Sequence, residues 1–194
     1  MAAMTTVLSM APQPARGVEV STEITAAAWS DTLVDIEILT GRAAQAAFHA
    51  GAPAVYQGRT IEAGVRLADD AELRELNREY CGQDKPTNVL SFNGLDDGEL
   101  ERLPPDAPLM LGDIVIAYET AAAEAACEAK SLGDHLSHLV VHGMLHLLGY
   151  DHIEEGDATL MERLEAEVLA GMGIANPYDA GSDSAAEQTG ARIR

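Results

Sequence analysis

Three of the six histidines in this chain lie in one short stretch, HGMLHLLGYDH, from His142 to His152. In a helix, His142 and His146 would lie one turn apart and project from the same face, so two imidazoles could bind one ion. His152 cannot join them by continuation of that helix, because six more residues at roughly 100° each carry it more than half a turn away. Gly149 can end the helix in the left-handed conformation and redirect the chain. The spacing therefore predicts that His152 returns to the other two histidines beyond a glycine turn.

The spacing H-x-x-x-H-x-x-G-x-x-H is the metal-ligand pattern of metzincin-type sites. Three neutral imidazoles that leave one position open suit a catalytic zinc ion, whose bound water can have a pKa of about 7. In metzincin proteases a glutamate that acts as general base follows the first histidine, and this chain has Gly143 there. The pattern thus predicts a metal site without the protease base. Nickel or copper would also accept these ligands, so the pattern leaves the metal open.

The elements that must position this motif can be predicted from the apolar pattern of the chain. Strands are expected at 18–24, 61–67, 87–92 and 111–118. Helices are expected at 25–49 with an interruption near Gly41, and at 69–80, 119–130, 133–148 and 154–171. We expect a single α+β domain in which a small mixed sheet of about four strands packs with about five helices, with the metal-binding helix in the core. The domain should span 18–178, between a disordered leader at 1–17 and a disordered tail at 179–194.

The lack of a long apolar run and the two cysteines indicate the cellular compartment that we expect for this protein. No run approaches the ~18 consecutive apolar residues of a membrane span, and the N-terminus lacks a charged region followed by an apolar one. The two cysteines, Cys81 and Cys127, fit neither a disulfide framework nor a metal pair. These observations favour a cytoplasmic protein with reduced thiols and no membrane partner.

The net charge of −20, from 12 basic and 32 acidic residues, argues against binding nucleic acid by bulk electrostatics. Five of the basic residues do gather within 59–85, namely Arg59, Arg66, Arg74, Arg78 and Lys85. Seven acids share that region. A basic groove would therefore require a fold that separates the two signs, and a mixed-charge solvated face is the alternative.

Together with the upstream segments GQDKPTNVLSF and LGDIVIA, the histidine motif resembles the YbeY family of metal-dependent endoribonucleases, known as rRNA maturation factors. The resemblance runs from about Val18 to Tyr178, although Asn93 replaces the proline that commonly follows the SF pair. It implies one zinc ion per chain, bound by His142, His146 and His152. It also implies a single-stranded rRNA substrate, a role in maturation of the 16S rRNA 3′ end and in quality control of 70S ribosomes, and ribosomal or small-subunit assembly proteins as partners.

The resemblance also assigns a catalytic role to Arg66. The family has a functional arginine on the strand matched here by VRLADDAELRELN, whereas the pattern alone favours an exposed strand arginine. A guanidinium near the zinc could bind the scissile phosphate and offset developing charge. The general base stays open: a metal-bound hydroxide could attack directly, or Asp151 or a neighbouring histidine could accept the proton of the ribose 2′-OH. We expect His135 and His138 to face solvent, with a contact to a metal ligand or to the substrate as the alternative, and Met161 to lie in the core.

Three other functions remain compatible with the sequence. A zinc peptidase fits the histidine spacing but lacks the glutamate base. A non-catalytic ribosome assembly factor with a structural metal fits the acidic composition, because it would bind protein rather than open RNA. A hydrolase of small phosphoesters fits the metal site alone.

Overall fold

The fold is built on one mixed β-sheet with the strand order β1-β2-β4-β3-β5. The computed structural model describes residues 17–95, 98–100, 102–104, 107–152, 154–179 and 191–193. Three strands run parallel to one another: β1 (Val18–Ile24), β2 (Ile61–Ala68) and β4 (Leu109–Ala117). β3 (Val89–Asn93) runs antiparallel to β4, and the short β5 (Ala191–Ile193) pairs in parallel with β3.

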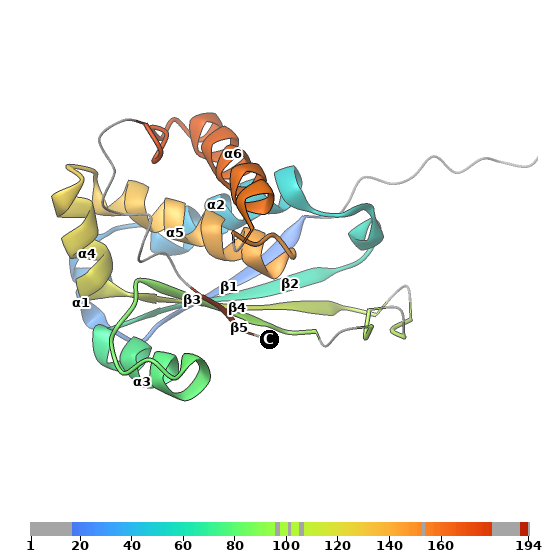
Figure 1. Ribbon diagram of the computed structural model, residues 1–194, viewed down its shortest axis with the longest axis horizontal. Helices are drawn as coiled ribbons and strands as arrows, with labels where there is room; N and C mark the ends of the chain where they lie inside the picture. The colour runs from blue at the N-terminus through green and yellow to red at the C-terminus, as the bar shows by residue number, and fades with distance from the viewer. Residues whose placement is uncertain are drawn as a thin grey trace, which may run out of the picture.

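Helices lie on both faces of this sheet (Figure 1). One face carries α2 (Ile36–Gly51) and α5 (Leu132–Leu147), with α6 (Glu155–Gly171) packed on top of them. The opposite face carries α3 (Asp70–Cys81). The remaining short elements are α1 (Ala27–Thr32), the 3-10 helix η1 (Ala54–Tyr56) and α4 (Tyr118–Cys127). α5 is thus the middle layer between the sheet and α6.

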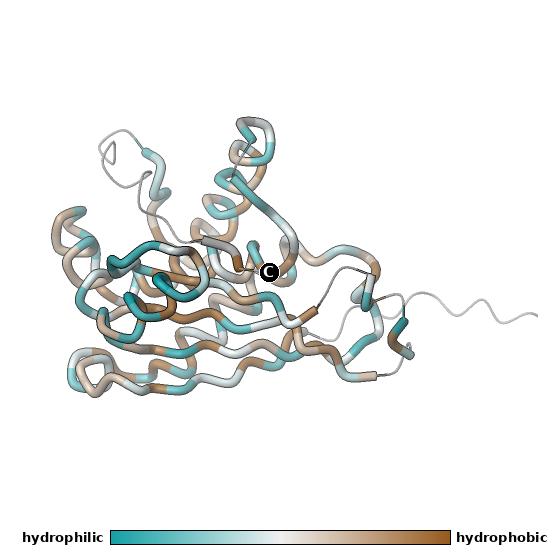
Figure 2. Tube along the Cα trace, turned by 60° about the horizontal axis from the view of Figure 1, so that its bottom comes forward, coloured by the Kyte–Doolittle hydropathy of each residue, from teal (hydrophilic) through white to brown (hydrophobic). Residues whose placement is uncertain are grey.

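Alternation along β2 divides its side chains between two cores. Ala63, Val65 and Leu67 join the main core beneath α2 and α5, while Arg66 is exposed on the other face. A smaller apolar cluster beneath α3 contains Leu73. Figure 2 shows the same alternation of hydrophobic and hydrophilic residues along the strands. The sheet face on which a side chain lies therefore decides whether it can approach α5.

α5 is buried along most of its length because it lies between two layers. Ser131 caps its N-terminus, where Oγ accepts a 3.0 Å hydrogen bond from the backbone N–H of Asp134. Twelve of its sixteen residues are buried. At Gly143 the helix approaches β4 so closely that an added Cβ would lie 2.7 Å from Cγ2 of Ile114. This packing holds the helix, and the histidines on it, in a fixed position.

The predicted fold class is confirmed, with two differences in the elements. The helix expected at 25–49 is two helices, and the break lies at 33–35 rather than near Gly41, because Asp35 adopts the left-handed conformation with φ 53°. The four predicted strands are present, and β5 is a fifth that the pattern did not indicate. Three residues are too few for a periodicity to be read, and β5 is held by pairing with a strand that is far away in sequence.

The predicted terminal segments fall mostly outside the described residues. The leader at 1–17 is described only at Gly17, and the tail at 179–194 only at Asp179 and in β5. The prediction of disorder was wrong for Ala191–Ile193, where Ile193 is buried in the small cluster beneath α3. Among the helices of the described residues, none has the length and apolar character needed to cross a membrane.

Candidate metal centre

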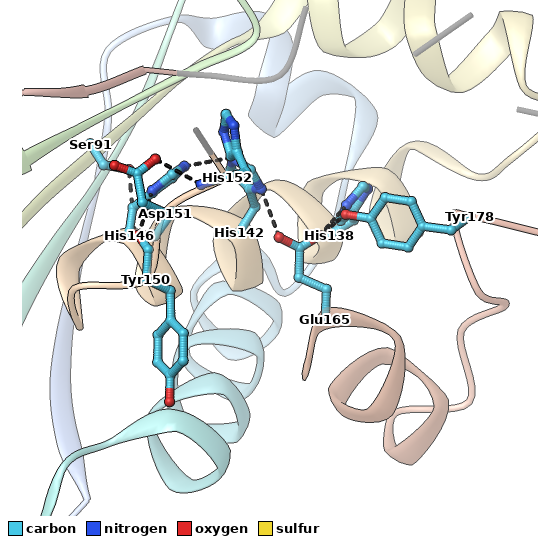
Figure 3. A network of polar contacts seen from close by, with 10 residues as sticks. Ser91, His138, His142, His146, Tyr150, Asp151, His152, Glu165 and Tyr178 are labelled. Atoms are coloured by element: carbon cyan, nitrogen blue, oxygen red, sulfur yellow. Dashed lines mark hydrogen bonds and ion pairs between the residues drawn. The ribbon is translucent and has the colours of Figure 1, made fainter. Parts of the chain in front are cut away.

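The structure brings His142, His146 and His152 together as their spacing predicted (Figure 3). α5 ends in two hydrogen bonds, from the Gly149 N–H to the carbonyl of His146 and from the Tyr150 N–H to the carbonyl of Leu145. This pairing defines a Schellman motif, in which Gly149 takes φ 101° and reverses the chain. One ring nitrogen from each of the three histidines then lies within 4.8 Å of the others. The bend therefore completes a three-imidazole cluster.

The hydrogen bonds on the two helical histidines fix which ring nitrogen faces the cluster. Nδ1 of His142 lies 2.7 Å from Oε1 of Glu165, and Nδ1 of His146 lies 3.0 Å from the carbonyl oxygen of Tyr150. Carboxylate and carbonyl oxygens only accept hydrogen bonds, so in neutral rings both Nδ1 atoms carry the hydrogen. The Nε2 lone pairs then face each other at 3.0 Å. Two lone pairs this close repel unless a cation lies against both, so the donor set fits a metal ion.

Burial keeps His146 in the form that a metal needs. The loss of hydration on burial, together with repulsion from His142 and His152, lowers the pKa of His146 from its ordinary 6.5 to about 3. The ring is therefore neutral at physiological pH and needs no deprotonation to bind a metal. His152, in contrast, is exposed. Two histidines of the cluster are thus held in the protein interior, and the third lies at the surface, where solvent can reach the cluster.

Glu165 in α6 contacts the histidine cluster, and the sequence pattern did not single it out. Its carboxylate is 1% exposed and accepts hydrogen bonds from His142, His138 and the hydroxyl of Tyr178. Burial alone would raise the pKa of Glu165, but attraction to His142 and the hydrogen bonds from His138 and His142 outweigh it and hold the pKa well below its usual range. Burial and the neighbouring Glu165 raise the pKa of Tyr178, which therefore stays protonated and donates. A signal was available, because Glu165 follows the buried Met161 by one helical turn.

The prediction that His135 and His138 face solvent was wrong. The His135 side chain is 4% exposed, and its Nε2 lies 2.8 Å from Oε2 of Glu124. The His138 side chain is 14% exposed and bonds to Glu165. Both histidines lie on the part of α5 that α4 and α6 cover, which a helical pattern alone does not reveal. Met161, predicted as a core residue, is buried.

The structure also explains why the protease glutamate is missing. The position after His142 is Gly143, which faces β4 rather than the histidine cluster. A side chain there would overlap the buried Ile114. A glutamate at this position could not reach a substrate at the histidines without displacing α5 from the sheet.

Arg66, the remaining predicted site residue, does not join the histidines. Its guanidinium is paired with Glu23 at 2.9 Å and with Glu72 of α3 at 3.3 Å. It therefore lies on the α3 face of the sheet, whereas α5 lies on the other face. The prediction that this guanidinium sits beside the metal was wrong, because alternation along β2 turns Arg66 away from α5.

The basic groove considered for 59–85 does not form among the described residues. Arg74 pairs with Asp84, Arg78 pairs with Glu75, and Arg66 has its two acidic partners. Lys85 is exposed. Three of the five basic side chains are thus paired with acidic ones, as in the mixed-charge face considered as the alternative.

Comparison with known proteins places this architecture in a family. The family model described as "Endoribonuclease YbeY" matches residues 29–173. A relative from Paramagnetospirillum magneticum, named "Endoribonuclease YbeY", is 48% identical over 161 residues, which cover 83% of this chain and 96% of that protein. Another of the same name, from Rhodospirillum rubrum, is 49% identical over 154 residues, which cover 77% and 76%. A solution structure from Thermotoga maritima aligns over 84% of this chain and 98% of that one, with a TM-score of 0.47 at 20% identity.

The fold and the site define a class, an α+β domain with a three-histidine group that can hold a metal ion. The family match covers well over half of the chain, and the relative from Paramagnetospirillum magneticum agrees over nearly its full length. The chain belongs to the endoribonuclease YbeY family.

Proposed function

We propose that this protein is a zinc-dependent endoribonuclease that cleaves single-stranded rRNA, acting in maturation of the 16S rRNA 3′ end and in quality control of 70S ribosomes. Family membership supports cleavage of RNA, and the relatives carry that activity in their names. The observation that carries the metal dependence is the pair of Nε2 atoms 3.0 Å apart, with each Nδ1 already bonded elsewhere. A role on ribosomes, with small-subunit assembly proteins as partners, places the protein in the cytoplasm.

His142, His146 and His152 would hold one zinc ion per chain. Bound zinc supplies Lewis-acid stabilisation to a phosphate oxygen and lowers the pKa of a coordinated water, which is the chemistry that phosphodiester hydrolysis needs. Because His152 is exposed, the cluster is open to a flexible single strand on that side. A small cavity of about 120 Å³ lies beside it, lined by residues that include Met161, Glu162 and Tyr178.

The protein's own groups limit the choice of proton acceptor. Glu165 cannot serve, because both of its oxygens already accept hydrogen bonds inside the protein. Asp151 follows Tyr150 at the cluster, where its charge acts on His146. Glu162 lines the adjoining cavity. These two carboxylates are the candidates to accept a proton from the attacking hydroxyl.

The acidic composition limits how the protein can bind an RNA substrate. With a net charge of −20, the protein should not hold long RNA by general attraction, and binding should depend on contacts at the metal centre. A peptidase is disfavoured, because Gly143 occupies the position of the general base and a side chain there does not fit.

The test compares cleavage of a single-stranded rRNA fragment and of the same sequence annealed to its complement. We expect cleavage of the single strand only, its loss in His146→Ala, and retention in His49→Ala, which removes an exposed histidine of α2. Equal cleavage by wild type and His146→Ala would reveal a contaminating nuclease and contradict the proposal. Cleavage of casein or of p-nitrophenyl phosphate in place of RNA would favour the peptidase or the small-phosphoester hydrolase.

A further inference from the structure

Glu165 is unusual for a charged residue, because it is the only acidic side chain that is buried among the described residues. A carboxylate loses its hydration when it is buried, so it is tolerated only where protein donors replace the lost water. α5 and the segment after α6 supply these donors: His138 and His142 lie on α5, and Tyr178 lies in the segment after α6. Three donors on one buried carboxylate indicate a purpose beyond filling the core.

The two oxygens of Glu165 have different partners. Oε1 accepts from Nδ1 of His142 at 2.7 Å. Oε2 accepts from Nε2 of His138 at 3.0 Å and from the Tyr178 hydroxyl. Figure 3 shows the carboxylate reaching up from α6 between His142 and His138, with the Tyr178 ring pointing towards it. Oε2 is therefore held by both His138 and Tyr178, and this keeps Oε1 against Nδ1 of His142.

The consequence for His142 is one ring orientation and one tautomer. An acceptor at Nδ1 requires the hydrogen there and leaves Nε2 with its lone pair. That Nε2 atom is the one aimed at the cluster, 3.0 Å from Nε2 of His146. His146 is oriented in the same way by the backbone carbonyl of Tyr150. A carboxylate is a stronger acceptor than a carbonyl, and it also makes the opposite ring nitrogen a better electron donor.

We infer that Glu165 is the positioning residue of the metal centre: it holds His142 in the tautomer that binds metal and strengthens that ligand, while His138 and Tyr178 hold Glu165 itself in place. The inference rests on the proposed metal site, but its test does not require RNA. Because Tyr178 belongs to the segment after α6, this segment is linked through Glu165 to a metal ligand on α5.

The experiment compares wild type with Glu165→Gln and with Glu167→Gln. Glu167 lies on the same helix with its side chain 65% exposed, so it controls for the change in net charge. Zn²⁺ affinity is measured by competition with a chromophoric chelator, and ring tautomers are measured in metal-free protein by long-range ¹H–¹⁵N NMR. We expect Glu165→Gln to bind Zn²⁺ about 10–100-fold more weakly and to lose the single Nδ1–H tautomer of His142. Glu167→Gln should match wild type in both measurements.

Wild-type affinity and an unchanged His142 tautomer in Glu165→Gln would overturn the inference. If this variant does not fold, Tyr178→Phe decides, because it removes one anchor of Oε2 and keeps the ring. We expect Tyr178→Phe to weaken Zn²⁺ binding, and affinity equal to that of wild type would then count against the inference. Failure of the proposed function gives a different result, in which the wild type binds Zn²⁺ and shows the His142 tautomer but leaves RNA intact.

Discussion

Gly143 and Ile114 lie in direct contact where α5 crosses β4, and a Cβ on Gly143 would come within 2.7 Å of Cγ2 of Ile114. The residue that follows His142 is therefore a packing residue in this fold. A three-histidine cluster resembling that of metzincins is combined here with a helix that leaves no room for the protease base. The contact leaves no room for a glutamate after His142, and this can be tested by introducing one.

Gly143→Glu should destabilise the protein without creating a peptidase. The substitution forces a charged side chain against a buried isoleucine, and we expect it to lower the free energy of unfolding by at least ~3 kcal/mol. Urea unfolding and a casein assay provide the measurements. Gly156→Glu is the matched control, because an added Cβ on Gly156 meets nothing within 4 Å. A Gly143→Glu protein that is as stable as wild type and digests casein would contradict the packing argument.

Metal-free protein should lose stability as the pH falls below neutral. The unfolded chain protonates His146 near its ordinary pKa of 6.5, whereas the folded protein resists protonation until about pH 3. Stability is therefore fully present above about pH 6.5 and is lost as the pH falls towards 3, by about 2 kcal/mol at pH 5. The lowered pKa of Glu165 adds a loss only below its ordinary value of 4.5.

Urea unfolding in EDTA at pH 7 and at pH 5 measures this loss. His146→Gln should show a smaller difference between the two pH values, whatever its absolute stability, and His49→Gln should keep the wild-type difference. An equal difference in wild type and His146→Gln would assign the acid sensitivity to other groups.

Much of the candidate site could be predicted from the sequence, because its geometry depends on residues that are close together in the chain. The spacing of His142 and His146 is a property of any helix, and Gly149 is suited to the reversal that returns His152. The strands followed from alternation in the same way. The break at 33–35 did not, because the left-handed Asp35 carries no compositional mark.

What the sequence could not provide were contacts between distant segments. Glu165 and His142 are 23 residues apart in different helices, and no periodicity links them. Alternation along β2 predicted that Arg66 and Val65 lie on opposite faces of the sheet. Only the packing of α5 shows that the face of Val65 is the one beneath the histidines. Alternation shows which residues share a face of the sheet, but it does not show which helix covers that face.

Arg66→Ala should leave the chemical step unchanged. Because the guanidinium lies across the sheet from the histidines, it cannot contact a phosphate held there. Its exposed ion pairs should contribute at most about 1 kcal/mol to stability. We expect unchanged Zn²⁺ affinity and kcat, with any effect confined to KM in steady-state cleavage of a single-stranded fragment. A large fall in kcat at constant KM would place Arg66 at the reacting phosphate and refute this arrangement.

Asp151→Asn and Glu162→Gln should identify the proton acceptor. The acceptor variant should lose about 10²–10⁴-fold in kcat and lose the acidic limb of the pH–rate profile, while binding Zn²⁺ normally. The other variant should keep the wild-type kcat and the acidic limb of the profile. If neither variant changes the profile, neither carboxylate accepts the proton.

The central claim, that His142, His146 and His152 hold a metal ion on which RNA cleavage depends, is tested most directly by titrating Zn²⁺ into metal-free, tag-free protein and measuring cleavage of a single-stranded rRNA fragment. We predict that the rate rises from zero and levels off at one ion per chain, and that His152→Ala gives no cleavage over the same range. Full cleavage by the metal-free protein, or a titration curve of His152→Ala that overlays that of wild type, would contradict the claim.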